Sequence, residues 1–134
     1  MKEQDLKGKY IVAWDTIVDG HQCATDDKGN PNPELFDSEE AAMDELFDDA
    51  LSMIENLTDE ELEEHGITSA QRDLMKIIAQ DGKQGSKQKF LDENPECNYN
   101  DEFIVSAEEF VFGRKAYFQA RNGGHIEGKK LTDF

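Results

Sequence analysis

The first pattern along the chain is a run of β-branched and aromatic residues from Lys9 to Val18, which predicts a strand. Asp19-Gly20 follows directly, and this dipeptide favours a two-residue hairpin turn. His21 to Thr25 is then the predicted return strand. Residues 26–34 contain Gly, Asn and two prolines, so they read as a loop.

The next segment changes to a helical period. A helix is expected to begin at Asp37 or Ser38, with Asp37 capping it and Glu40 completing a variant capping box, and to run to Asn56. At about 100° per residue, one face is apolar and the opposite face is acidic. The apolar face holds Met43, Leu46, Phe47, Ala50, Leu51, Ile54 and Leu57, and the acidic face holds Asp44, Glu45, Asp48, Asp49 and Glu55.

Two further capping boxes predict two more helices. Thr58 has Glu61 three residues on, and Gly66 suits the position after a helix end. Thr68 has Gln71 at the same spacing. These two helices are predicted over residues 58–65 and 68–82, and one more short helix, stopped by Pro95, over residues 86–94.

The last third of the chain returns to strand-like sequence. Residues 102–112 predict a strand that a turn of helix at 106–109 could interrupt, and residues 114–120 predict another. Asn122-Gly123 is a second hairpin signal, and residues 125–131 would return.

These elements together predict an α+β fold. We expect an antiparallel sheet of about four strands, formed by the two chain ends, with a central block of three to four helices packed on one face. The 134 residues show no internal repeat or linker, so residues 1–134 are expected to form a single α+β domain.

Net charge changes this picture because it is concentrated. The chain carries −17 at pH 7, from 31 acidic and 14 basic residues. Residues 29–71 contain 14 of the acids and no Lys or Arg, so this third of the chain carries −14. A negative chain of this kind disfavours nucleic acid and anionic membranes as direct partners and favours a basic protein.

The spacing of the acids resembles that of phosphates. Six acids fall between Glu39 and Asp49, which as a helix span about 16 Å, or about one charge per 2.7 Å. One DNA strand carries a charge about every 3.4 Å. The helix also has no basic residue four positions from its acids, and Asp44–Asp48 and Glu45–Asp49 are like-charge pairs that cost helix stability.

The first functional hypothesis is therefore a non-enzymatic acidic binding or inhibitor protein. It would mimic nucleic acid and block a basic nucleic-acid-binding protein or nuclease, as anti-restriction, anti-CRISPR or immunity proteins of phage or bacteria do. The partner-binding residues would be Asp44, Glu45, Asp48, Asp49, Glu55, Asp59, Glu60, Glu61, Glu63 and Glu64.

Two alternatives stay open. The chain could be a housekeeping interaction domain or subunit that uses its sheet or hairpins, with acids that serve only solubility, and an exposed apolar patch on the sheet would favour this alternative. It could also be a small carboxylate-dependent hydrolase, although among 31 acids no catalytic pair can be named. The sequence leaves the oligomeric state open.

Candidate cofactor and metal chemistry is sparse. His21 and Cys23 lie near two aspartates, but four ligands at a recognised spacing are absent, and a calcium loop over residues 15–26 fails at its third position, Ile17. We expect no cofactor, no metal and no catalytic residue. Cys23 and Cys97 are expected to be free thiols, although one disulfide stays possible, and without a signal-peptide-like or membrane-spanning run the protein is expected to be cytoplasmic.

Overall fold

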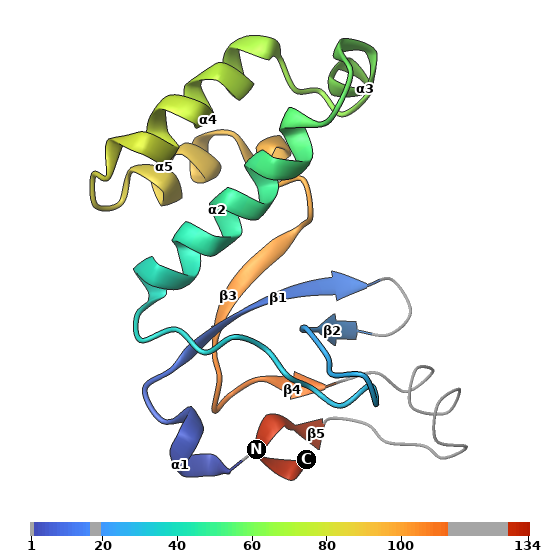
Figure 1. Cartoon of the computed structure of the whole chain (residues 1–134), viewed down its shortest axis with the longest axis vertical. Coiled ribbons are helices and arrows are strands. Elements are labelled where there is room, and N and C mark those ends of the chain that lie inside the picture. Colours follow the sequence, from blue (N-terminus) through green and yellow to red (C-terminus); the bar gives the residue numbers. More distant parts are fainter. Residues whose placement is uncertain (1, 17–19, 113–128) are drawn as a thin grey trace. The chain divides into compact units, whose positions relative to one another are not determined.

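The computed structural model describes residues 2–16, 20–112 and 129–134, and its class is α+β, as predicted (Figure 1). The chain divides into two compact units. The first comprises Met1–Ala42 with Glu102–Phe134, and the second comprises Met43–Asp101. The expectation of one domain over residues 1–134 stays a prediction.

The first unit contains a three-stranded antiparallel sheet. Its strands are β1 (Tyr10–Thr16), β2 (Gly20–Gln22) and β3 (Glu102–Ser106), in the order β2-β1-β3. The register sets Asp15 opposite His21 on one side of β1, and Val12 opposite Ile104 on the other. The chain ends thus supply the sheet, as the sequence predicted.

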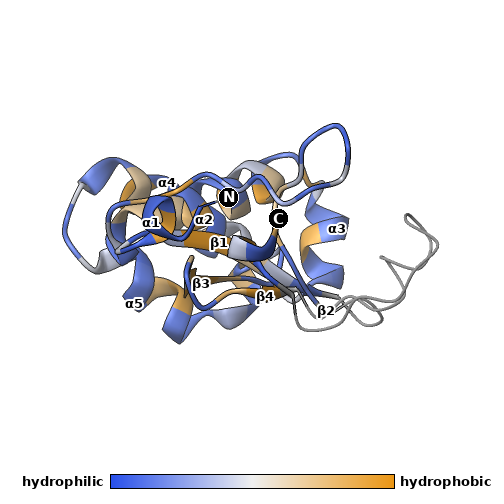
Figure 2. Cartoon of the chain, turned by 90° about the horizontal axis from the view of Figure 1, so that it is seen from below, coloured by the Kyte–Doolittle hydropathy of each residue, from blue (hydrophilic) through white to orange (hydrophobic). Residues whose placement is uncertain are grey.

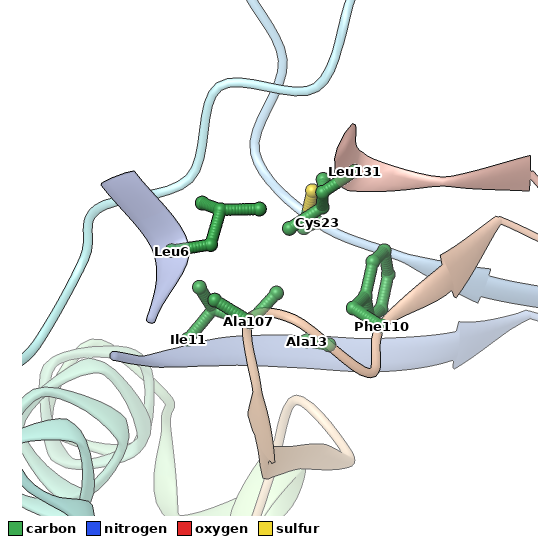
Figure 3. Packing of buried hydrophobic residues seen from close by; sticks show 7 residues of the cluster. All are labelled: Leu6, Ile11, Ala13, Cys23, Ala107, Phe110 and Leu131. Atoms are coloured by element: carbon green, nitrogen blue, oxygen red, sulfur yellow. The ribbon is translucent and has the colours of Figure 1, made fainter. Parts of the chain in front are cut away.

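Side chains alternate along β1, as they must in a strand with one buried face. Ile11 and Ala13 are fully buried, while Tyr10, Val12 and Trp14 are half-buried. Figure 3 shows the buried cluster that Ile11 and Ala13 join, with side chains converging from several segments. The cluster consists of Leu6, Ile11, Ala13, Cys23, Ala107, Phe110 and Leu131.

The strand count differs from the prediction of about four strands in one sheet. β3 ends at Ser106, a turn follows in which the Glu109 N–H donates to the Ser106 carbonyl (3.2 Å), and β4 (Val111–Phe112) pairs instead with β5 (Lys129–Lys130). The described residues therefore hold one three-stranded and one two-stranded sheet. The predicted strand 114–120 and the Asn122-Gly123 turn lie outside the described residues.

Two short elements of the first unit were not predicted. Helix α1 (Glu3–Leu6) lies in the polar N-terminal segment, and the 3₁₀ helix η2 (Leu131–Asp133) follows β5. Leu6 and Leu131 are both fully buried in the cluster of Figure 3. A single leucine in a polar segment gives no periodic signal, so only the tertiary contact reveals these anchors.

Helix α2 (Glu39–Glu55) begins in the first unit and continues into the second. Its cap differs from the expectation. The Ala41 N–H donates to the Ser38 hydroxyl (3.1 Å), so Ser38 caps the helix, whereas the Asp37 carboxylate pairs with Lys9. Both residues can cap a helix, and the ion pair with Lys9 engages Asp37 elsewhere.

The second unit is helical. It holds the remainder of α2, then α3 (Asp59–Glu64), α4 (Ser69–Asp81), α5 (Ser86–Glu93) and the 3₁₀ helix η1 (Pro95–Cys97). Both predicted capping boxes, Thr58 with Glu61 and Thr68 with Gln71, are complete. In the part of the chain that the structure describes, no helix has both the length and the apolar character needed to cross a membrane.

Candidate functional site

All ten predicted partner-binding acids lie on α2 or α3. On α2 they form two neighbouring stripes, because residues three, four and seven apart share a helix face. Asp44, Asp48 and Glu55 form one exposed stripe. Glu45 and Asp49 form the other and are half-buried.

A lysine from α5 reaches the first stripe. Lys87 Nζ lies 3.2 Å from Asp44 Oδ1 and 3.6 Å from Asp48 Oδ1. The same ammonium lies 5.6 Å from the centroid of the Phe47 ring, and the Lys87 side chain is only 14% exposed. Lys87 is therefore an enclosed cation held by two carboxylates and an aromatic face.

This contact corrects one inference from the sequence. Because no base lies four positions from Asp44 or Asp48 on their own helix, the sequence indicated that the usual surface ion pairs are missing. Lys87 supplies a cationic partner through the tertiary fold. The Lys87 ammonium thereby offsets the repulsion between Asp44 and Asp48. The row of negative charge along α2 is therefore partly neutralised near its middle.

Two acids of α3 also have structural roles. Asp59 Oδ1 lies 3.8 Å from Arg72 Nη1, although the Asp59 side chain is 92% exposed, so this pair contributes little stability. Glu61 accepts a hydrogen bond from the Thr58 backbone N–H (3.1 Å) as part of the capping box. This backbone bond, together with the Thr58 hydroxyl, lowers the pKa of Glu61 below its ordinary value.

Four of the ten acids are open to solvent. Glu55, Glu60, Glu63 and Glu64 are exposed, and within the described residues none of their side chains has an ion pair or hydrogen bond. On α3, Leu62 is the buried position, and Glu60 and Glu64 lie about 160° from it around the helix. Figure 2 shows α3 as a hydrophilic helix with one hydrophobic band.

α3 is fixed without using these open carboxylates. At its N-terminus it has the capping box. At its C-terminus the Ile67 N–H donates to the Leu62 carbonyl (2.9 Å) and the Gly66 N–H donates to the Glu63 carbonyl (3.0 Å), which is a Schellman motif. Gly66 has φ +71°, which favours glycine, and Leu62 and Ile67 are both buried beneath the motif. The motif thus holds the acidic face in one geometry.

The other two candidate residues named from the sequence, His21 and Cys23, have separate contacts in the structure. His21 Nε2 lies 2.8 Å from Asp15 Oδ1 and its ring packs edge-on against Phe103 (5.0 Å), while Cys23 is buried in the cluster of Figure 3. Among the described residues, no group of three or more His, Cys, Asp or Glu side chains is arranged to hold a metal ion.

A pocket of about 500 Å³ lies beside α1. Its lining contains two lysines and two glutamates and no histidine, cysteine or serine, so it holds no imidazole base and no thiol or serine hydroxyl nucleophile. The lining residues are Lys2, Glu3, Gln4, Lys7 and Glu108.

The cysteines are free and buried, at 1% exposure for Cys23 and 0% for Cys97. Burial, with a smaller contribution from the Glu96 carboxylate, raises the pKa of the Cys97 thiol to about 11. A thiol of this kind is a poor nucleophile at neutral pH.

Sequence reasoning missed two features of the helical unit. One is Lys87. The sequence placed it in a helix but did not show that it contacts Asp44, Asp48 and Phe47. The other is a set of exposed apolar side chains, Met53 (43%), Leu74 (45%) and Ile77 (65%). For Leu74 and Ile77 a signal existed, because α4 carries apolar residues on more of its circumference than one buried face requires.

No protein-family model, curated protein or solved structure matches the chain.

Proposed function

We propose that this chain is a non-enzymatic binding protein that engages a basic protein through its acidic helices. The observation that carries the proposal is α3. Its caps, together with buried Leu62, fix this short helix, and it presents Glu60, Glu63 and Glu64 to solvent without cationic partners among the described residues. Preformed, unneutralised charge of one sign steers and binds the opposite charge.

The spacing of the α3 glutamates suits a partner that binds phosphate groups. Glu60 to Glu64 rises about 6 Å along the helix axis, close to the length of two phosphate spacings on one DNA strand. Glu55, at the end of α2, adds a further open carboxylate. We therefore propose that the partner is a nucleic-acid-binding protein, such as a nuclease. We also propose that its main contact is with α3 rather than with the whole of α2.

The pairing with Lys87 helps to distinguish acids that serve the fold from acids that are free to bind a partner. Asp44 and Asp48 have a structural explanation, so their presence supports no partner. Glu60, Glu63 and Glu64 have none among the described residues, and Glu60 with Glu64 costs helix stability as a like-charge pair. Two free, buried thiols suit a reducing compartment, so we propose that the protein acts in the cytoplasm.

The test compares three forms of the full chain. One is the natural sequence, the second is E60K/E63K/E64K, and the third is D27K/E34K/E93K. The third is the matched control, because Asp27, Glu34 and Glu93 are exposed acids outside α3 and the two variants have the same net charge. Each form is immobilised and incubated with a nuclease-treated bacterial lysate, and retained proteins are identified by mass spectrometry.

The natural chain and the control should retain basic proteins at about 0.1 M salt, where the Debye length is about 10 Å, and release them near 1 M, where it is about 3 Å. The α3 variant should retain far less, and duplex DNA should displace the captured protein. Equal loss in both variants would show that only bulk charge matters, and the proposal would then be abandoned.

A further inference from the structure

The strongest feature outside the acidic surface is an apolar stripe on α4. Ala70, Leu74 and Ile77 lie at positions i, i+4 and i+7, so they share one face, and Asp81 continues it by one turn. All four are exposed, with Leu74 at 45% and Ile77 at 65%. We define these four residues as the α4 stripe.

The stripe is not the core-facing side of the helix. Met75 is fully buried, and it lies about 130° around the helix from the centre of the stripe. Ile78 is half-buried between the two faces. α4 thus has a core face and a second apolar face, on which an exposed leucine and an exposed isoleucine lie in one row.

The charge at the C-terminal end of the stripe favours a basic occupant. Asp81 stands at the C-terminal end of α4, and the last turn contains no Lys or Arg. The helix dipole also places partial negative charge at this end. A carboxylate there is unfavourable for the helix alone, and it is suited to a cation brought by a partner.

A second copy of the chain fits poorly, because two chains of net charge −17 repel each other. The stripe is also small, since two large apolar side chains fall well short of the roughly 800 Å² per partner of a stable interface. The stripe therefore suits the apolar part of a contact that is also held by opposite charges.

We propose that the α4 stripe docks a basic amphipathic helix of the partner protein. Leu74 and Ile77 receive the apolar face of that helix, and a Lys or Arg beside that face meets Asp81 at the end of α4. This inference rests on the proposed function, and it adds that the partner presents a helix with both apolar and basic character.

The test uses two synthetic peptides of identical Leu/Lys composition. In one, the leucines recur at i, i+3, i+4 and i+7 and form an apolar face; in the other, the order is shuffled so that no face exists. Binding to the full chain is measured by fluorescence anisotropy at about 0.1 M salt. The amphipathic peptide should bind the natural chain about tenfold more tightly than the shuffled one.

In L74Q/I77Q that ratio should fall to near one, while the shuffled peptide binds as before. Both positions are exposed and Gln forms helices well, so the variant should stay folded, which circular dichroism checks. M53Q is the matched control, because it removes an apolar side chain of similar exposure (43%) from α2, and it should keep the ratio. A ratio that survives L74Q/I77Q, or falls equally in M53Q, overturns the proposal.

The acidic surface is tested separately in the same assay. E60K/E63K/E64K should weaken both peptides alike and keep their ratio, and failure of this arm would count against the proposed function rather than the stripe. Equal binding of both peptides to the natural chain would overturn the proposed docking at the α4 stripe and would leave the proposed function unaffected. Sedimentation velocity completes the test, since a dimer of the natural chain that L74Q/I77Q dissociates would assign the stripe to a second copy and overturn the proposal.

Discussion

Lys87 Nζ lies 3.2 Å from Asp44 Oδ1, and this contact joins α5 to the acidic stripe of α2. The lysine also lies 3.6 Å from Asp48 and faces the Phe47 ring. One cation thereby compensates two carboxylates that would otherwise repel each other across one helical turn. The acidity of this part of α2 is a component of the fold and not a free surface.

Lys87→Met should lower the free energy of unfolding by about 1 to 2 kcal/mol, from two partly enclosed ion pairs and a cation–π contact. Urea denaturation at low salt measures it. The exposed Lys89, also on α5, supplies the control, and Lys89→Met should have a much smaller effect. K87M/D44N/D48N should recover most of the lost stability because the repulsion is removed as well. No recovery in that triple variant would mean that Lys87 acts by packing alone.

The two capping boxes differ in one chemical respect, since Glu61 titrates and Gln71 does not. The pKa of Glu61 is lowered in the folded chain by its bonds with Thr58. The ionised group therefore contributes stability that is fully present above the ordinary glutamate pKa of about 4.3 and is lost as pH falls through the lower folded-state value.

Glu61→Gln should consequently be less stable than the natural chain at pH 7, and the difference should vanish in acid. Chemical denaturation at a series of pH values gives the difference directly, so that the other carboxylates cancel. Thr68→Ala provides the reference, with a cost of about 1 kcal/mol that should stay constant across the same range. A Glu61→Gln difference independent of pH would contradict the assignment.

Features that depend on residues close together in the chain were predicted from the sequence, whereas features that depend on tertiary contacts were not. Both capping boxes, the glycine after α3 and the end of α4 depend on residues within a few positions, and all were predicted. The contact of Lys87 with Asp44 depends on how α5 packs beside α2, and no local pattern encodes that. The stabilising partner of the predicted acidic row was therefore invisible in the sequence.

The same reasoning explains the sheet and the N-terminus. β1 was predicted from its composition, whereas the departure of β4 to pair with β5 depends on the turn after Ser106 and on a distant segment. Leu6 is an isolated apolar residue in a charged segment, yet it is fully buried. Periodicity detects a face of several residues and cannot detect a single anchor.

Both cysteines should be unreactive in the folded chain. Cys23 and Cys97 are almost completely buried, and the pKa of Cys97 is raised to about 11, so little thiolate forms at neutral pH. With Ellman's reagent at pH 8, we expect slow modification in native buffer and rapid release of two equivalents in denaturant. One fast equivalent in native buffer, assigned by peptide mapping to Cys97, would show that its surroundings open readily.

Glu64→Lys tests whether the acids of α3 are kept at a cost to stability. Glu60 and Glu64 are four residues apart on α3 and repel each other, whereas a glutamate followed four residues later by a lysine is the favourable order for an i,i+4 pair. The introduced lysine would also stand at the C-terminal end of α3, where the dipole favours a cation. We expect Glu64→Lys to raise the free energy of unfolding by about 0.5 kcal/mol at low salt, and by less at high salt, in urea denaturation. Glu64→Gln, which removes the repulsion without making a pair, should fall between the two. A variant that is more stable but captures less of the basic partner would show that the glutamate serves binding at the expense of the fold, and a variant that is less stable than the natural chain would refute this account of α3.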